Sequence, residues 1–258
     1  MAFLKSRIPT LEVAIDEGRG PVVVLLHGIA SSAVTFEKLI PLLSKHHRVI
    51  ALNLLGCGNS PAPDIEYTTN QHVESVRNTL LRLGIVGRFT LIGHSMGGLI
   101  GARFAVKYGF WLKRLVLVST PIYPPLHTAN NPLDLVQLGF YREFYNYLKA
   151  NPNFTSKTAA ALNALSPIKR IISVDERGWE ATKRSMTNVI QGQTTLADLT
   201  LVKTPVELVY GTIDPFLSST GTAAAARLAN ITAHPVDLID HVIREPMAKV
   251  IGNLVDKV

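Results

Sequence analysis

The sequence has few of the features that mark secreted, membrane-bound or metal-clustered proteins. Cys57 is its single cysteine, so an internal disulfide is excluded and a cysteine-based metal site is not expected. No apolar run approaches the roughly 18 residues of a membrane-spanning helix. Residues 1–15 carry Lys5, Arg7 and Glu12 and lack the apolar core of a signal peptide. We therefore expect no stable membrane insertion, with the cytoplasm as the default compartment.

Runs of like charge are also missing, although the formal net charge is +7. The basic residues occur at most in pairs, such as Lys113-Arg114, with no interleaved aromatic stripe. A nucleic-acid partner is therefore not expected. With 47% hydrophobic and 17% charged residues, the composition is that of a globular protein. The 258 residues suit one large domain, or a core domain with an inserted lobe.

What the sequence does contain is an alternation of strand-like and helix-like segments. The predicted strands are residues 11–15, 21–26, 47–52, 88–92, 114–119, 205–210 and 234–239. The predicted helices are residues 32–43, 69–83, 96–108 and 220–229. Continuously apolar strands such as residues 21–26 (PVVVLL) are typical of burial on both faces. The alternation predicts a three-layer α/β fold, with a mostly parallel sheet and helices on both faces.

This rhythm is interrupted in the second half of the chain. Residues 121–200 show helical patterns and no clear buried strand. We therefore predict an α/β core formed by residues 1–120 and 201–258, with residues 121–200 as an inserted helical lobe. The lobe is rich in aromatic residues, which are Phe140, Tyr141, Phe144, Tyr145 and Tyr147. They either form the roof of an apolar pocket or pack the lobe onto the core.

One short motif points to chemistry. The segment from Gly93 to Gly98 (GHSMGG) matches Gly-x-Ser-x-Gly between a predicted buried strand and a predicted helix. A serine in such a turn needs strained backbone angles, and small neighbours prevent collisions. The helix that follows directs amide groups toward developing negative charge. The motif therefore predicts Ser95 as a nucleophile.

Serine needs a positioned base to act as a nucleophile. Of the eight histidines, His241 follows the last predicted strand, at the carboxyl edge of the sheet where open α/β sheets bind ligands. His94 adjoins Ser95, so its side chain is expected to point away and pack. The other histidines are His27, His46, His47, His72, His127 and His234. His241 is therefore the predicted base.

The base in turn needs a carboxylate to orient it. Asp214 follows the strand at 205–210 and again lies at a carboxyl end, whereas Asp240 directly adjoins His241. Adjacent loop residues rarely place a carboxylate against the imidazole, so Asp214 is the prediction and Asp240 the alternative. The order Ser95, Asp214, His241 is that of α/β-hydrolases.

The residues resemble the α/β-hydrolase superfamily over nearly the whole chain. Four blocks carry the resemblance: Leu26-His27-Gly28, Gly56-Cys57-Gly58-Asn59-Ser60, the motif around Ser95, and the Asp214 and His241 loops. The resemblance implies an oxyanion hole formed by the backbone amides of Ile29 and Met96. It also implies that the inserted lobe is a cap over the site. The chain departs from the usual family pattern at Asn53 and at Asp240, where relatives commonly have Asp and Gly.

These features predict a serine hydrolase that cleaves small to medium carboxylic esters, with a small-molecule substrate and no metal or organic cofactor. Whether the chain forms a homodimer is left open. Within the fold, the alternative is a carbon–carbon bond hydrolase that binds a vinylogous keto acid through a cap arginine. The candidates for that arginine are Arg142, Arg170, Arg177 and Arg184. Outside enzymes, the alternative is a ligand receptor that kept the fold and turns over slowly or not at all.

Overall fold

A computed structural model describes most of the chain. The described residues are 8–124, 139, 143, 146–151, 153–155, 157–158, 160–161 and 175–256. No helix in these ranges is both long enough and apolar enough to cross a membrane. The predicted cap is therefore described in part, and residues 125–138 and 162–174 lie outside the description.

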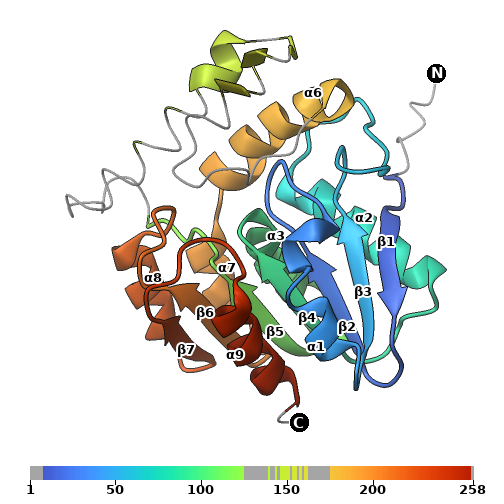
Figure 1. Cartoon of the computed structure of the whole chain (residues 1–258), viewed down its shortest axis with the longest axis vertical. Helices are drawn as coiled ribbons and strands as arrows, with labels where there is room; N and C mark the ends of the chain where they lie inside the picture. Colours follow the sequence, from blue (N-terminus) through green and yellow to red (C-terminus); the bar gives the residue numbers. More distant parts are fainter. Residues whose placement is uncertain are drawn as a thin grey trace.

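A seven-stranded sheet in the order β1-β3-β2-β4-β5-β6-β7 forms the centre of the described structure (Figure 1). Its strands are β1 (Glu12–Glu17), β2 (Val22–Leu26), β3 (Arg48–Asn53), β4 (Phe89–His94), β5 (Leu112–Val118), β6 (Val206–Gly211) and β7 (Ile231–Val236). β1 is antiparallel to β3, and the other neighbouring strands are parallel. The carboxyl ends of six strands therefore meet at one edge.

Alternation along the strands builds two apolar cores. In β2, Val24 and Leu26 belong to one buried cluster, whereas Val23 and Leu25 belong to the other. Successive side chains of a strand point to opposite faces, so an all-apolar strand supplies both cores. The continuous apolar run at residues 21–26 therefore marks a central strand.

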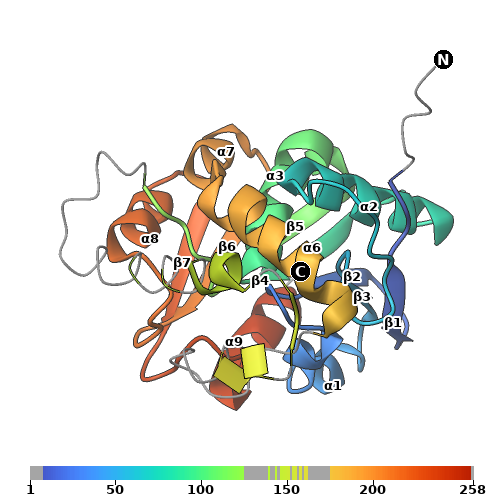
Figure 2. The same cartoon turned by 90° about the horizontal axis from the view of Figure 1, so that it is seen from above.

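Helices cover both faces of the sheet (Figures 1 and 2). One core is closed by residues of α2 (Thr69–Arg82), α3 (Met96–Tyr108), α7 (Thr195–Leu201) and α8 (Ser219–Ala226). The other is closed by η1 (Ala33–Phe36), α1 (Ile40–Leu43) and α9 (Glu245–Asp256). A short 3₁₀ turn, η2 (Gly109–Trp111), follows α3. The predicted three layers are present.

Two predicted elements differ from the structure. The helix expected at 32–43 consists of η1 and α1, and Pro41 stands in the first turn of α1, where a missing amide hydrogen costs nothing. The last strand, β7, begins at Ile231, three residues before the start of the predicted strand at 234–239, and ends at Val236. β7 is an edge strand, where Pro235 is tolerated, and its polar residues obscured the point at which the strand begins.

The described end of the predicted cap packs on the core. It comprises α6 (Glu176–Ser185), the π-helical segment η4 (Met186–Gln191) and α7. Arg184 donates to the carbonyl of Ile65 at 2.6 Å, and Asn188 donates to the carbonyl of Glu66 at 2.5 Å. Figure 1 shows α6 beyond the carboxyl ends of the strands. The boundaries of the cap stay a prediction.

Gly56 permits a close approach between α6 and the loop after β3. It has φ +75°, and a Cβ atom there would lie 2.2 Å from the Cβ of Ala181. We expect Gly56→Ala to lower the free energy of unfolding, because the left-handed backbone costs about 1–2 kcal/mol and overpacking about 1–3 kcal/mol. Urea denaturation measures the loss. Gly84→Ala is the control, since Gly84 has φ +70° but no atom within 4 Å of its added Cβ. Equal losses in both variants would show that the Ala181 contact is unimportant.

Candidate active site

Ser95 lies in a strained turn between β4 and α3. Its backbone has φ +53° and ψ −121°, and the residue is 3% exposed. Its amide donates to the carbonyl of Val118 on the neighbouring strand at 2.9 Å. A Cβ atom on Gly97 would lie 2.1 Å from the Leu26 carbonyl oxygen. The turn therefore requires glycine beside the serine, as the motif predicts.

His241 and Asp214 form a buried pair at the carboxyl edge of the sheet. His241 Nδ1 lies 2.8 Å from Asp214 Oδ2, and the two side chains are 4% and 0% exposed. The other carboxylate oxygen, Oδ1, accepts the amide of Phe216 at 2.9 Å. Both oxygens are thus engaged, which fixes the carboxylate plane and through it the imidazole.

Asp240, the alternative orienting carboxylate, faces elsewhere. Its Oδ2 accepts from Arg244 at 2.5 Å, and its Oδ1 accepts the Val242 amide at 3.1 Å. The structure therefore brings Asp214, and not Asp240, to the ring nitrogen of His241.

His94, the residue before Ser95 in the chain, packs against His241 of this pair. The ring of His94 lies 4.8 Å from the ring of His241, centroid to centroid. Between Ser95 and His241, both of which the structure describes, no hydrogen bond is present. Nucleophile–base contacts are often long and tighten only when substrate binds. The three predicted residues therefore share one edge of the sheet, with His241 held by Asp214.

The loop after β2 packs directly against the serine. A Cβ atom on Gly28 would lie 3.0 Å from Ser95 Cβ and 3.4 Å from Ser95 Oγ. Ile29 follows in the same loop and is half-buried, while Met96 is the buried first residue of α3. Both segments expected to supply the oxyanion hole therefore adjoin Ser95.

His27 anchors that loop. Its Nδ1 lies 2.7 Å from the carbonyl oxygen of Gly28, and the Leu54 amide donates to its Nε2 at 2.9 Å. Since a carbonyl only accepts and an amide only donates, Nδ1 carries the hydrogen. Burial lowers the pKa of His27 to about 4, so the ring is neutral near pH 7. The sequence motif included His27, but it did not predict that the His27 ring links the Gly28 carbonyl to the Leu54 amide.

Other polar residues of the sequence motifs have structural partners. Asn53, where relatives commonly have Asp, accepts the Ala33 amide at 2.9 Å and donates to Glu12 at 2.6 Å. Burial raises the pKa of the Cys57 thiol to about 12, which leaves it protonated and a weak nucleophile.

The remaining described histidines do not contact Asp214. His72 binds Ser185 at 3.1 Å, His234 pairs with Glu207 at 2.7 Å, and His47 lies 3.5 Å from Asp256. His46 is exposed, and His127 lies outside the described residues. Within the described chain, His241 is therefore the histidine that pairs with a carboxylate at the sheet edge where Ser95 lies.

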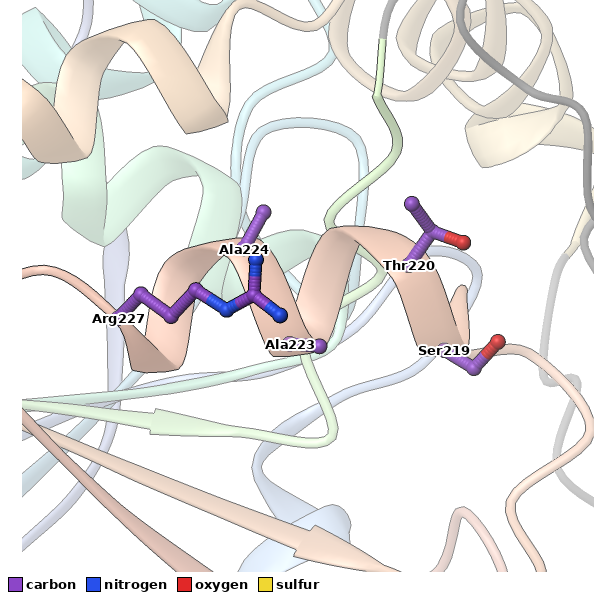
Figure 3. A pocket seen from close by; sticks show the side chains of 5 residues that line it. All are labelled: Ser219, Thr220, Ala223, Ala224 and Arg227. Atoms are coloured by element: carbon purple, nitrogen blue, oxygen red, sulfur yellow. The ribbon is translucent and has the colours of Figure 1, made fainter.

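A surface hollow of about 370 Å³ lies on α8 and contains none of the predicted site residues (Figure 3). The described side chains that line it come from α8 and its C-cap residue, and are Ser219, Thr220, Ala223, Ala224 and Arg227. Across the described residues, no group of three or more His, Cys, Asp or Glu side chains is arranged to hold a metal ion.

Three buried histidines make stability depend on pH. Burial lowers the pKa of His72 and of His94 to about 3, and that of His27 to about 4, against 6.5 for an ordinary histidine. Below pH 6.5 the unfolded chain binds protons that the folded chain does not. We therefore expect the free energy of unfolding to fall from pH 6.5 toward pH 4, by up to about 1.4 kcal/mol per pH unit for each histidine.

Urea denaturation at several pH values measures this slope. A His72→Phe variant removes one of the three titrating groups and should show a slope smaller by one proton. A slope that is unchanged in this variant would contradict the burial effect at His72.

Comparisons with known proteins agree with this architecture. A family model described as alpha/beta hydrolase fold matches residues 21–165. A 2-hydroxy-6-oxo-6-(2'-aminophenyl)hexa-2,4-dienoic acid hydrolase from Metapseudomonas resinovorans is 31% identical over 133 residues, which cover 50% of this chain and 45% of the relative. A probable lysophospholipase, BODYGUARD 3 from Arabidopsis thaliana, is 36% identical over 139 residues, or 52% of this chain and 27% of the relative. The chain thus matches less than half the length of either relative.

Solved structures share the fold over more of the chain. A hydrolase from Pseudomonas aeruginosa PA01 superposes with a TM-score of 0.71 at 21% identity, and covers 93% of this chain and 91% of its own. A serine hydrolase involved in carbazole degradation (CarC) superposes with a TM-score of 0.68 at 22% identity, with coverages of 93% and 90%. These likenesses confirm the predicted fold class.

Proposed function

Because the chain belongs to the α/β-hydrolase fold family, we propose that it is a serine hydrolase in which Ser95, His241 and Asp214 form a catalytic triad. The observation that carries the proposal is the buried 2.8 Å contact between His241 Nδ1 and Asp214 Oδ2, at the same sheet edge as Ser95. A base oriented by a carboxylate beside a strained, buried serine is the arrangement that activates a hydroxyl.

The reaction proceeds in two acyl-transfer steps. His241 takes the Ser95 proton as Oγ attacks the substrate carbonyl, and the amides of Ile29 and Met96 stabilise the resulting oxyanion. His241 then gives the proton to the leaving alcohol, which leaves an acyl group on Ser95. Water, deprotonated by His241, releases the acid and restores the serine.

Asp214 stabilises the protonated base in this cycle because it is buried and hydrogen-bonded. Its carboxylate is removed from solvent and bonds to the imidazole on one oxygen and to the Phe216 amide on the other. A charge held in a low-dielectric site stabilises the imidazolium that forms during each proton transfer more than an exposed charge does. Because Nδ1 donates to Asp214, Nε2 is the nitrogen that accepts the serine proton.

Small to medium carboxylic esters are the proposed substrates. The proposal rests on the aromatic residues of the predicted cap, of which Phe140, Tyr141, Phe144 and Tyr145 lie outside the described residues or have undescribed side chains. The described Tyr147 packs against the main core, and its hydroxyl donates to the carbonyl of Thr158 at 3.3 Å. Tyr147 therefore holds the cap together and is not assigned to a pocket roof.

A carbon–carbon bond hydrolase is the second candidate, because one relative is a hydrolase of a dienoic acid. A substrate carboxylate would need a cap cation. Arg184 already pairs with Glu180 and Asp64, whereas Arg177 is near enough to the Cys57 loop to offset a small part of the increase in the thiol pKa that burial causes. Arg142 and Arg170 lie outside the described residues. Arg177 is therefore the best described candidate.

Two measurements test these functions together. A fluorophosphonate should label the protein on Ser95, and mass spectrometry identifies the labelled residue. In a steady-state assay, the protein should turn over p-nitrophenyl esters of increasing acyl length. Faster turnover of a ring-cleavage dienoate than of any ester would favour the carbon–carbon bond hydrolase. Labelling without turnover would favour a ligand receptor, and the absence of labelling would overturn the triad.

A further inference from the structure

His94, the residue before the nucleophile, joins the serine turn to the loop of the base. Its Nε2 lies 2.8 Å from the backbone carbonyl oxygen of His241, and its ring lies 4.8 Å from the His241 ring. The residue is 4% exposed. The sequence predicted that this side chain points away from the site and packs. It does pack, but against the proposed base.

The hydrogen-bond partner fixes the state of the ring. A carbonyl only accepts, so Nε2 carries the hydrogen and Nδ1 carries the lone pair. Nδ1 is buried and has no hydrogen-bond partner among the described residues. It lies 3.4 Å from the position of a Cβ atom on Gly28, in the loop expected to form the oxyanion hole. One ring therefore touches the nucleophile turn, the oxyanion loop and the base.

The same ring is unsuited to carry protons. Burial, together with the neighbouring His241, lowers the pKa of His94 to about 3. The other ionisable groups that act on it are Asp214, which favours its protonation, and His27, which opposes it. His94 is thus neutral over the pH range in which His241 would work as a base.

Two kinds of contact hold His241, one to its ring and one to its backbone. Asp214 holds its ring through Nδ1, and the ring of Phe216 lies 4.6 Å away. Neither contact fixes the backbone of the loop after β7, to which the ring is attached. The hydrogen bond from His94 to the His241 carbonyl fixes that backbone relative to Ser95, its own neighbour in the chain.

We propose that His94 is a positioning residue that sets the distance between Ser95 and His241 through its hydrogen bond to the His241 carbonyl. The inference rests on the proposed triad. A misplacement of about 1 Å at a reacting centre can cost 100-fold in rate, so the effect should be seen in kcat more than in KM.

Two substitutions separate the hydrogen bond from the ring. His94→Phe keeps an aromatic ring against His241 and loses the donor, whereas His94→Gln keeps a donor of similar reach and loses the ring. We expect kcat on p-nitrophenyl butyrate to fall by about 10- to 100-fold in the Phe variant, with KM little changed. The Gln variant should recover most of that loss.

His72→Phe is the matched control. His72 is also buried, also bonds through Nε2 alone, to Ser185, and also has an unpartnered Nδ1. Its substitution removes a buried hydrogen bond of a histidine Nε2, here to a hydroxyl, at a place outside the triad. The pH profile of fluorophosphonate labelling should shift in His94→Phe and stay that of the wild type in His72→Phe. Equal losses of kcat in both Phe variants would assign the effect to general destabilisation and overturn the proposal.

Histidine-ring NMR tests the inference without any turnover. In the wild type, His94 should stay in its Nε2–H form down to about pH 4, and its substitution by Phe should move the ring signals of His241, because the loop that carries His241 loses the hydrogen bond to its carbonyl. If wild-type protein shows neither labelling nor turnover, the proposed function fails, while these ring signals still test whether His94 positions His241. Unchanged His241 ring signals in His94→Phe, with unchanged kcat where there is activity, would contradict the positioning role.

Discussion

A Ser95→Ala variant is expected to lose about 10⁴- to 10⁶-fold in kcat on p-nitrophenyl butyrate, since removal of a triad serine costs up to about a million-fold. The loss follows because, among the described residues, Ser95 is the serine that lies in the strained turn at the sheet edge of the His241–Asp214 pair. Activity of about 1,000-fold over water should remain, since oxyanion donors and substrate binding still act. Initial rates with purified protein, corrected for the uncatalysed reaction, measure both quantities.

Cys57→Ala is the control for this experiment. Cys57 carries the one thiol of the chain and lies in a motif loop, but burial raises its pKa to about 12. Its substitution should therefore leave both labelling and turnover close to those of the wild type. Full activity in Ser95→Ala, or loss of activity in Cys57→Ala alone, would refute the assignment of the nucleophile.

Local patterns predicted the central elements well. The helix at 96–108 appears as α3 with the same bounds, because the elbow starts it and Gly109 follows its end. The strand at 21–26 appears as β2, one residue shorter. Both segments are set by short-range features, which are strongly apolar runs and special backbone positions. They need little information from the rest of the fold.

The elements that were mispredicted depend on tertiary context. β7 contains His234 and Pro235, which weaken a strand pattern, but its pairing with β6 supplies the missing stability. His234 is satisfied there by Glu207, a partner 27 residues away in the chain. Since an edge strand can be read only after its neighbour is known, pattern analysis placed it three residues too late.

The candidate site likewise combines features that local sequence patterns predict with contacts that form only in the folded molecule. The common location of Ser95, Asp214 and His241 could be predicted, because each follows a strand and parallel strands bring their carboxyl ends together. The contact of His94 with the His241 carbonyl spans 147 residues and leaves no trace in either local segment. The bond between Asn53 and Glu12 is equally hidden. Roles that act through such contacts can be found only in the folded molecule.

An Asp214→Asn variant is expected to lower kcat by about 10⁴-fold, because it reverses the tautomer of the base. In the wild type, Oδ1 of Asp214 accepts the Phe216 amide, which leaves Oδ2 for His241 Nδ1–H. The asparagine oxygen would keep the Phe216 amide, so its NH₂ group would face His241 Nδ1. That nitrogen would then have to accept, the hydrogen would move to Nε2, and Nε2 could no longer take the serine proton.

Asp240→Asn separates this effect from a general loss of negative charge near the base. Asp240 adjoins His241 in sequence, but its carboxylate bonds to Arg244 and to the Val242 amide. Loss of a partly exposed ion pair of this kind lowers stability by about 0–1 kcal/mol. Because the Asp240 carboxylate does not bond to the His241 ring, kcat should change by only a few-fold. The pH dependence of kcat/KM in both variants completes the comparison. If Asp240→Asn were the more damaged of the two, the orienting carboxylate would be Asp240. The present geometry, which places Asp214 and not Asp240 at 2.8 Å from the ring, predicts the opposite order.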